Sequence, residues 1–333
     1  MESAPLVSAV TPFYNTRDYL GECIESVLQQ SYKNWEYVFV DNCSTDGSSE
    51  IAADYVARYP DKMRLIHTPF FLSQVQNYNF ALTCISPNSK YCKMVQADDW
   101  LFPDCIRSMV EVAETYPTVG IVAAYELAGD KVNLDGLPYP SPQISGRDVC
   151  RLYFLRKMHL FGTPTSLLLR SELVTSRTPF YEERYAPFED THVCFDLLKT
   201  CDFGFVHQVL TYQRRNDNSI LSRFARMGFM AFSRLAMVAA HGRDYLSPEE
   251  FNRCLRDAER QYFLQLTRCA LRGRSQEFWE VNRKGLASIN YSLNRLMLVK
   301  WVPRAVVEKA WEIVGDTLDN SYKNDLSTAR KVI

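Results

Sequence analysis

Short apolar runs alternate with segments of helical spacing over the first 130 residues, and this alternation is the strongest constraint on the fold. The runs have the length of buried strands and lie at residues 6–11, 37–40, 63–67, 91–96 and 119–125. The segments between them gather apolar residues on one helical face, at residues 18–29, 48–58, 75–84 and 105–116. Strands and helices in this order form a mostly parallel sheet with helices on both faces. We therefore predict an α/β domain with its ligand site at the carboxyl edge of the strands.

The pattern changes twice further along the chain. Residues 129–147 are rich in Pro, Gly, Asp and Ser, which predicts a long loop that could act as a lid. Further helices and strands are expected at residues 147–157, 165–170, 191–200 and 203–212. From about residue 222 strand-like runs become rare, and helices are expected at residues 249–272, 276–288 and 305–318. A length of 333 residues suits two domains, so we predict an α/β domain over residues 1–220 and a helical region over residues 221–333.

Composition narrows the class of protein. The 38 basic and 39 acidic residues give a net charge of −1, so the overall charge does not favour nucleic acid or an anionic membrane as a partner. The N-terminus lacks the basic and apolar regions of a secretory signal, and no run of about 18 uncharged apolar residues predicts a transmembrane helix. The ten cysteines form no CxxC pair and no zinc spacing. We therefore expect a cytoplasmic chain with reduced thiols.

Carboxylates follow two of the expected strands. Asp41 ends the second strand in the segment VDNCSTDGS, where it either contacts a nucleotide or accepts hydrogen bonds within the turn. Asp46 is expected to cap the next helix. Asp98 and Asp99 follow the fourth strand, and a divalent cation would relieve the repulsion between them. Mg²⁺ and Mn²⁺ prefer oxygen ligands and often bridge carboxylates to phosphates. The pair therefore predicts a cation that neutralises a leaving diphosphate.

Several ordered segments resemble the family 2 glycosyltransferases of the GT-A fold. The resemblance begins with VSAVTPFYN, VFVDNCSTDGS and MVQADDWLFPD, in this order. It continues with QNYNFAL at 76–82, FGTPTS at 161–166 with Arg170, FED at 188–190, and YQRRN at 212–216. Together these segments cover about residues 5–220. The resemblance implies a GT-A type nucleotide-binding sheet flanked by helices. It also implies an inverting transfer of sugar from a nucleotide-sugar to a hydroxyl of the acceptor.

The same resemblance implies roles for individual residues. Asp99 would bind Mg²⁺ or Mn²⁺, and Asp190 would act as the general base that takes the acceptor proton. Glu189, beside this base, would orient the acceptor or share its role. Eight residues would hold the donor: Pro12, Tyr14, Asn15, Asp41, Gln76, Asn79, Asp98 and Arg214. The expected donor is a UDP-sugar, with dTDP- and GDP-sugars left open. The expected acceptor is a saccharide or a lipid-linked molecule of surface polysaccharide biosynthesis.

The chain departs from the family pattern at three places. Asn42 stands where the family has a second Asp, and Gln96 begins the segment QADD, so carboxylates remain only at Asp98 and Asp99. Arg214 and Arg215 stand where the family often has a His. A guanidinium binds diphosphate directly, which predicts a weaker dependence on the metal ion.

Other interpretations stay open. A nucleotidyltransferase that makes a nucleotide-sugar is one alternative, although residues 11–18 lack the Gly and Lys of a phosphate loop. A degenerate nucleotide-sugar-binding protein is another. The C-terminal segment RLMLVKWVPRAVVEKAWEIVG mixes apolar and basic residues. It would either lie on the inner face of the membrane or pack against its own domain or a second subunit of a homo-oligomer. His67, in a strand, is expected to be structural.

Overall fold

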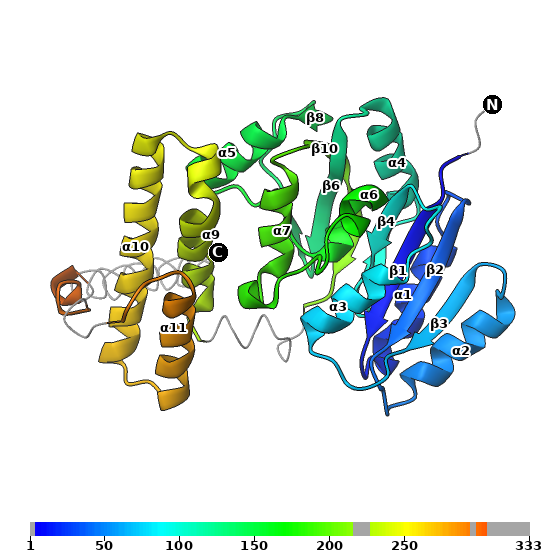
Figure 1. The fold of residues 1–333 in the computed structure, drawn as a ribbon, viewed down its shortest axis with the longest axis horizontal. Helices are drawn as coiled ribbons and strands as arrows, with labels where there is room; N and C mark the ends of the chain where they lie inside the picture. Colours follow the sequence, from blue (N-terminus) through cyan, green and yellow to red (C-terminus); the bar gives the residue numbers. More distant parts are fainter. Residues whose placement is uncertain (1–3, 216–226, 294–297, 305–333) are drawn as a thin grey trace, which may run out of the picture. The chain divides into compact units, whose positions relative to one another are not determined.

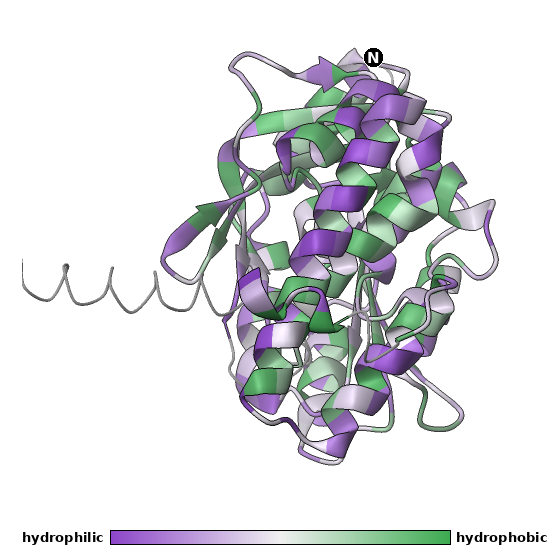
Figure 2. Ribbon diagram, turned by 90° about the vertical axis from the view of Figure 1, so that its left-hand side faces the viewer, coloured by the Kyte–Doolittle hydropathy of each residue, from purple (hydrophilic) through white to green (hydrophobic). Residues whose placement is uncertain are grey.

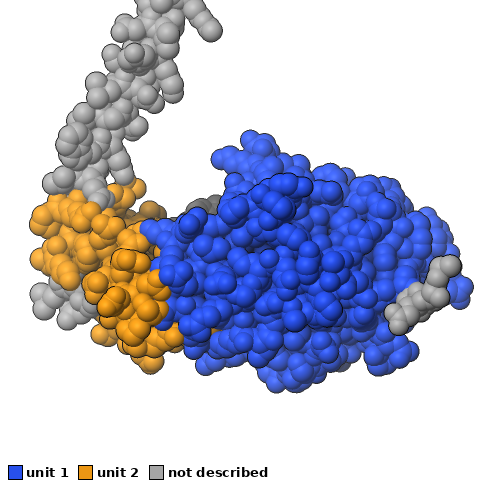
Figure 3. All heavy atoms as spheres, turned by 90° about the horizontal axis from the view of Figure 1, so that it is seen from above, with its two compact units in different colours: residues 1–220, 244–246 blue, residues 221–243, 247–333 orange. Residues whose placement is uncertain are grey.

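The structure is a computed structural model that describes residues 4–215, 227–293 and 298–304. The chain divides into two compact units, which Figure 3 colours separately. The first unit comprises residues 1–220 and 244–246, and the second comprises residues 221–243 and 247–333. The helix expected over residues 305–318 lies outside the described residues.

The first unit is built on one mixed sheet, which has ten strands in the described part of the chain (Figure 1). Eight of them follow in the order β3-β2-β1-β4-β9-β6-β10-β5. Their bounds are β1 Val7–Phe13, β2 Trp35–Asp41, β3 Met63–His67, β4 Tyr91–Met94, β5 Trp100–Leu101, β6 Val119–Ala128, β9 Leu167–Arg170 and β10 Asp202–Gln213. The β3-β2-β1-β4 half is parallel, whereas β9 runs antiparallel to both β4 and β6. The predicted α/β sheet is confirmed, with an antiparallel insertion.

Helices cover both faces of this sheet. α1 (Arg17–Leu28), α2 (Ser48–Arg58) and α4 (Cys105–Thr115) share one apolar core with the odd-numbered residues of β1 and β2. α3 (Gln74–Thr83) packs against β1 and β2 and takes no part in that core. Successive strand residues point to opposite faces, so the buried even-numbered residues Val10, Val38 and Val40 face the α3 layer. Successive apolar residues of β1 and β2 therefore pack alternately against the helices on one face of the sheet and against α3 on the other.

The segment over residues 129–147 is more regular than the predicted loop. β7 (Lys131–Asn133) forms a hairpin with β6, and β8 (Gln143–Ile144) pairs with β10. Ala128 is paired with Lys131, so the hairpin turn has two residues, and Gly129 supplies the positive φ of 63° that such turns require. α5 (Gly146–Arg156) follows, and its N-cap Ser145 accepts from the Asp148 amide.

Three helices make up the second unit as far as it is described: α9 (Phe229–Tyr245), α10 (Pro248–Leu271) and α11 (Gln276–Ser288). Ser247 and Glu250 form a capping box at the start of α10, with Pro248 at its first position. Asn282 joins α11 to α10 by accepting from the Tyr262 hydroxyl at 2.9 Å. Hydrophilic residues interrupt the apolar ones along these helices (Figure 2), and among the described residues no helix is both long and apolar enough to cross a membrane.

Candidate functional site

A pair of carboxylates lies just beyond β4. Asp99 is 2% exposed, and its two oxygens accept from the Thr165 hydroxyl at 2.7 Å and from the Arg214 amide at 3.0 Å. Burial, followed by the charge of Asp98, raises the pKa of Asp99 well above its ordinary value. The fold therefore holds Asp99 rigidly, with both oxygens already engaged.

Asp98 is the more accessible member of this pair. Its carboxylate is partly exposed, and no other residue in the described ranges donates a hydrogen bond to it. Burial raises the pKa of Asp98, while the Arg214 guanidinium lowers it. An incoming cation or hydroxyl would therefore meet the lone pairs of Asp98 before those of Asp99.

The carboxylate pair suits a cation that is shared with phosphate. The described residues contain no group of three or more His, Cys, Asp or Glu side chains that could hold a metal ion alone. Mg²⁺ commonly takes only one or two protein carboxylates and completes its shell with substrate phosphates and water. Two carboxylates with raised pKa values, one of them accessible, fit such a cation.

Arg214 is fixed beside the same pair. Its Nε donates to the Asp98 carbonyl at 3.1 Å, and its guanidinium pairs with Glu22. The guanidinium carbon lies 4.6 Å from the Tyr19 ring centroid and 5.2 Å from that of Trp100. Such stacking orients a guanidinium. The structure therefore places the positively charged guanidinium of Arg214 close to Asp98.

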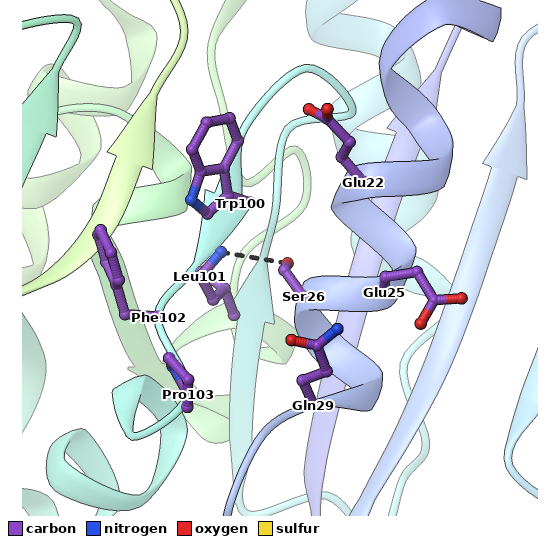
Figure 4. A pocket seen from close by; sticks show the side chains of 8 residues that line it. All are labelled: Glu22, Glu25, Ser26, Gln29, Trp100, Leu101, Phe102 and Pro103. Atoms are coloured by element: carbon purple, nitrogen blue, oxygen red, sulfur yellow. Dashed lines mark hydrogen bonds between the residues drawn. The ribbon is translucent and has the colours of Figure 1, made fainter.

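An open pocket of about 380 Å³ adjoins this arginine, between α1 and β5 (Figure 4). Glu22, which pairs with Arg214, and Trp100, which stacks on it, both line the pocket. Two residues that line the pocket are joined by a hydrogen bond, in which the Leu101 amide donates to the Ser26 hydroxyl at 3.1 Å (dashed line in Figure 4).

Asp41 ends β2 and is 3% exposed. One carboxylate oxygen accepts from the Ser44 amide at 2.9 Å, and the other lies 3.2 Å from Nδ1 of His67. The turn interpretation and the ligand interpretation are compatible, because each oxygen keeps a second lone pair. His67 is the feature that sequence reasoning missed, since its contact with Asp41 arises only from the pairing of β2 with β3.

The other residues expected near the nucleotide lie at or just beyond the carboxyl end of β1. Pro12 is inside the strand, opposite Val40. Tyr14 is 45% exposed. Asn15 adopts a positive φ of 50°, and its side-chain oxygen accepts from the Thr45 amide at 2.8 Å. The sheet thus brings Tyr14 and Asn15 to the edge where Asp41 lies.

Gln76 and Asn79 have structural contacts on α3. The Gln76 side chain closes the capping box with Ser73. The Asn79 amide donates to the Tyr181 carbonyl at 2.8 Å and accepts from the Tyr181 amide at 2.7 Å. Contact with a donor would compete with these bonds, so the roles of both residues in donor binding stay predictions.

Asn42 has a structural reason to differ from Asp. Its side-chain nitrogen donates to the Leu72 carbonyl, and its oxygen accepts from the Leu72 amide, both at 2.9 Å. An ionised Asp only accepts, so it would lose the first of these bonds. Asn42 therefore fastens the loop that follows β3.

A second carboxylate pair begins α7 (Glu189–Leu197). Asp190 is partly exposed and accepts from the Thr191 amide at 2.6 Å. Burial, followed by the charge of Glu189, raises the pKa of Asp190 to about 8. Glu189 is 6% exposed, its pKa is raised by burial, and its Oε2 has no hydrogen-bond partner among the residues that the structure describes. Both acids thus favour their protonated forms more than free side chains do.

Glu126, in β6, connects the two pairs and was missed by sequence reasoning. It is 3% exposed, accepts from the Thr163 hydroxyl at 3.0 Å, and has a pKa raised by burial. Burial and the adjacent carboxylate are the main causes of the raised pKa of Asp99 and of Asp190, and the charge of Glu126 adds a smaller rise to both. All three carboxylates therefore share one electrostatic environment. The available signal was a single acid inside the apolar run GIVAAYELA.

Comparisons with known proteins identify the family and the fold of the chain. The model of the family described as Glycosyl transferase family 2 matches residues 8–182. A Bacillus subtilis (strain 168) protein named as the glycosyltransferase EpsE is 28% identical over 232 residues, which span 66% of this chain and 82% of that protein. TuaG of the same organism, named for teichuronic acid biosynthesis, is 53% identical over 51 residues, which span 15% of this chain and 20% of that protein.

Two solved structures resemble the chain in fold. S. aureus TarS in complex with UDP-GlcNAc gives a TM-score of 0.59 at 14% identity, over 85% of this chain and 79% of that chain. The mannosyltransferase PcManGT from Pyrobaculum calidifontis, in complex with GDP-Man and Mn²⁺, gives a TM-score of 0.54 at 18% identity. That match covers 93% of this chain and 88% of the other. At these identities the likeness shows the fold alone.

Proposed function

The chain belongs to glycosyl transferase family 2 and is a glycosyltransferase of the GT-A fold, and on this premise we propose the reaction that it catalyses. It transfers a sugar from a nucleotide-diphosphate sugar to a hydroxyl of a saccharide or lipid-linked acceptor, with inversion at the anomeric carbon. The pathway is surface polysaccharide biosynthesis, a proposal supported by the similarity to TuaG. The observation that carries the reaction is the buried Asp99, which the Thr165 hydroxyl and the Arg214 amide hold beside Asp98 beyond β4.

The proposed donor is a UDP-sugar. TarS is known with UDP-GlcNAc and PcManGT with GDP-Man, which supports a nucleotide-sugar but leaves its base and sugar open. Asp41 and Tyr14 would contact the base, with Pro12 and Asn15 at its border. Asp98 would contact the ribose or sugar, and Arg214 the diphosphate. The order of β2, β1 and β4 in the sheet supports this proposal, because it aligns the carboxyl ends of these parallel strands.

Asp98 and Asp99 would hold Mg²⁺ or Mn²⁺. When bound, the ion supplies positive charge that stabilises the leaving diphosphate. Arg214 supplies a second positive charge at the same strand end, which is our reason to expect residual activity without the ion.

Asp190 is the proposed general base. Its carboxylate removes the proton from the acceptor hydroxyl, whose oxygen attacks the anomeric carbon. The new carbon–oxygen bond forms as the bond to the diphosphate breaks, the proton stays on Asp190, and the nucleoside diphosphate leaves from the opposite face. General-base assistance is worth about 10²–10⁴-fold. A base is most effective with a pKa near the working pH, and that of Asp190 is about 8.

The test is a binding and hydrolysis screen of UDP-, dTDP- and GDP-sugars with Mg²⁺ or Mn²⁺. Asp190→Asn should bind the selected donor normally and lose transfer. Asp148→Asn, on the exposed start of α5, is the matched control and should keep both. Normal transfer by Asp190→Asn would remove it as the base, and binding of no nucleotide-sugar would refute the proposed function. Adding nucleoside triphosphate and sugar phosphate to the screen tests the nucleotidyltransferase alternative.

We also propose that the protein is cytoplasmic, that it contacts the inner face of the membrane peripherally, and that it forms a homo-oligomer. The cytoplasmic location rests on the N-terminal sequence and the cysteine pattern, and the other two proposals rest on the sequence of the C-terminal region. Liposome flotation of the full chain and of a chain ending at residue 289 tests the membrane contact. Equal flotation of the two forms would argue that the C-terminal segment is not the anchor.

A further inference from the structure

Lys93 is a fully buried lysine in β4. Its side chain is 0% exposed, and burial lowers its pKa. Lysine is almost never fully buried unless its ammonium has partners. The Nζ of Lys93 donates to two backbone carbonyls, that of Thr165 at 2.5 Å and that of Leu167 at 3.1 Å. It also lies 3.7 Å from the sulfur of Met109. Each of the three donors of an ammonium therefore has an acceptor nearby.

These contacts continue the connection of β4 where its backbone pairing stops. The antiparallel pairing of β4 with β9 ends at Cys92 and Leu169. The next residue of β4 is Lys93, and its side chain reaches Thr165 in the 3₁₀ turn η1 (Pro164–Ser166), which precedes β9. A buried side chain thus fastens this turn to the strand.

Thr165 contacts both Lys93 and the carboxylate pair. Its carbonyl accepts from Lys93, and its hydroxyl donates to Asp99 at 2.7 Å. The same hydroxyl accepts from the Gln96 amide at 3.0 Å. The end of β4 and the turn after it therefore hold Thr165 at its backbone and at its side chain. If the backbone of Thr165 shifted, its hydroxyl would move away from Asp99.

The start of the same turn is held by Glu126. Thr163 is the N-cap residue of η1, and its hydroxyl donates to Glu126 at 3.0 Å. Burial raises the pKa of Glu126, and the charge of Lys93 is among the effects that oppose this rise. A nearby positive charge favours the ionised form of a carboxylate, which is the stronger hydrogen-bond acceptor. Lys93 therefore supports both ends of the turn.

We propose that Lys93 is a positioning residue for the cation site. Its ammonium holds Thr165 in place, and Thr165 holds Asp99 beside Asp98, where the two carboxylates meet Mg²⁺ or Mn²⁺ and the diphosphate of the donor. This inference rests on the proposed function and adds a residue that acts on the cation through another side chain. Removing an outer partner of a ligating carboxylate commonly lowers metal affinity about 10–100-fold. Because Lys93 lies one contact further out, we expect the lower end of that range.

Lys93→Met provides the test, because methionine keeps much of the length of the side chain and loses every donor. Calorimetry would measure the binding of UDP, dTDP and GDP to the wild-type chain and to the variant, once with Mn²⁺ and once with EDTA. Lys93→Met should raise the Kd of the tightest-binding nucleotide about tenfold with Mn²⁺ and leave it within about twofold with EDTA. A general loss of folded protein would instead lower the number of binding sites in both conditions.

Cys92→Ala is the matched control. Cys92 is 1% exposed and precedes Lys93 in β4, so this variant also removes buried volume from the strand but leaves the Lys93 side chain in place. Its Kd values with Mn²⁺ and with EDTA should keep the ratio of the wild type. Lys93→Gln keeps one amide donor and should show a smaller loss in the same direction, which serves if the methionine variant does not fold.

A double variant tests whether Lys93 acts through Thr165. Residues that act along one path are not additive. Thr165→Val already removes the bond to Asp99, so adding Lys93→Met to it should raise the Kd with Mn²⁺ by less than about twofold.

Each result separates this inference from the proposed function. An unchanged Kd with Mn²⁺, equal weakening with Mn²⁺ and EDTA, equal effects of Lys93→Met and Cys92→Ala, or full additivity with Thr165→Val would overturn the inference alone. So would a wild-type chain that binds its nucleotide equally well with Mn²⁺ and with EDTA, since donor binding would then not depend on the cation. A wild-type chain that binds none of the three nucleotides would overturn the proposed function together with the inference.

Discussion

Thr165 offers the sharpest test of the way in which the fold holds the carboxylate pair. Its side chain is fully buried, donates to Asp99 at 2.7 Å, and accepts from the Gln96 amide at 3.0 Å. Thr165→Val keeps the volume of the side chain and removes both hydrogen bonds. Thr165→Ser keeps the hydroxyl and removes one methyl group, so it is the matched control.

The expected loss of stability follows from the two bonds. A hydrogen bond to a charged group contributes about 1.5–3 kcal/mol, and a buried amide left without a partner costs about 1–3 kcal/mol. Thr165→Val should therefore lower the free energy of unfolding by about 2.5–6 kcal/mol. The serine variant should lose only about 1 kcal/mol, the cost of one buried methyl group. Denaturant unfolding followed by circular dichroism measures both values.

The loss should depend on pH with a defined sign. The pKa of Asp99 is raised in the folded chain, and the Thr165 bond opposes that rise. A group whose folded pKa is raised destabilises the fold as pH increases from its unfolded pKa towards its folded pKa. Removing Thr165 raises the folded pKa further, so the difference between Thr165→Val and the wild type should grow as pH rises through the folded pKa of Asp99 in the wild type. Equal losses for the valine and serine variants, or a difference independent of pH, would refute the reasoning.

Four other outcomes are expected. Transfer by the wild type should rise with pH through about 8, where Asp190 becomes ionised, and a rate independent of pH between 6 and 9 would argue for another base. Glu189→Gln removes a charge that raises the pKa of Asp190. The acid limb of its pH–rate profile should therefore move to lower pH, whereas the control Glu172→Gln should leave the profile unchanged. Asn42→Asp should destabilise the fold by about 1–3 kcal/mol through loss of the bond to the Leu72 carbonyl, as measured by thermal unfolding, and an unchanged Tm would contradict this. The wild type should keep some activity in EDTA, and Arg214→Met should lose it. If the wild type itself loses all activity in EDTA and recovers it with Mn²⁺, direct diphosphate binding by Arg214 is ruled out.

Local sequence patterns were sufficient to predict the elements of the first half of the sheet, but not β5, β7, β8 or α9. Apolar runs and helical spacing depend on neighbours along the chain, and this information predicted β1 to β4 and the helices between them. Turn chemistry was less readable, because the N-cap of α2 is Gly47 and not Asp46 as expected. Asp46 lies one residue earlier, in the turn, where it accepts from the Ser48 amide at 3.0 Å. The ordered segments also predicted the family, which the match over residues 8–182 confirms.

The electrostatics of the site required the tertiary structure. Asp99 accepts from Arg214 at a separation of 115 residues along the chain, and only the pairing of β10 with β5 and β6 brings them together. Glu126 was not recognised, because the sequence does not show that this acid in β6 lies near Asp99 and Asp190 in the folded chain. The sequence alone determined which residues can ionise. The fold decided which of these residues are buried and which lie close enough to influence one another, because pKa values depend on burial and on nearby charges.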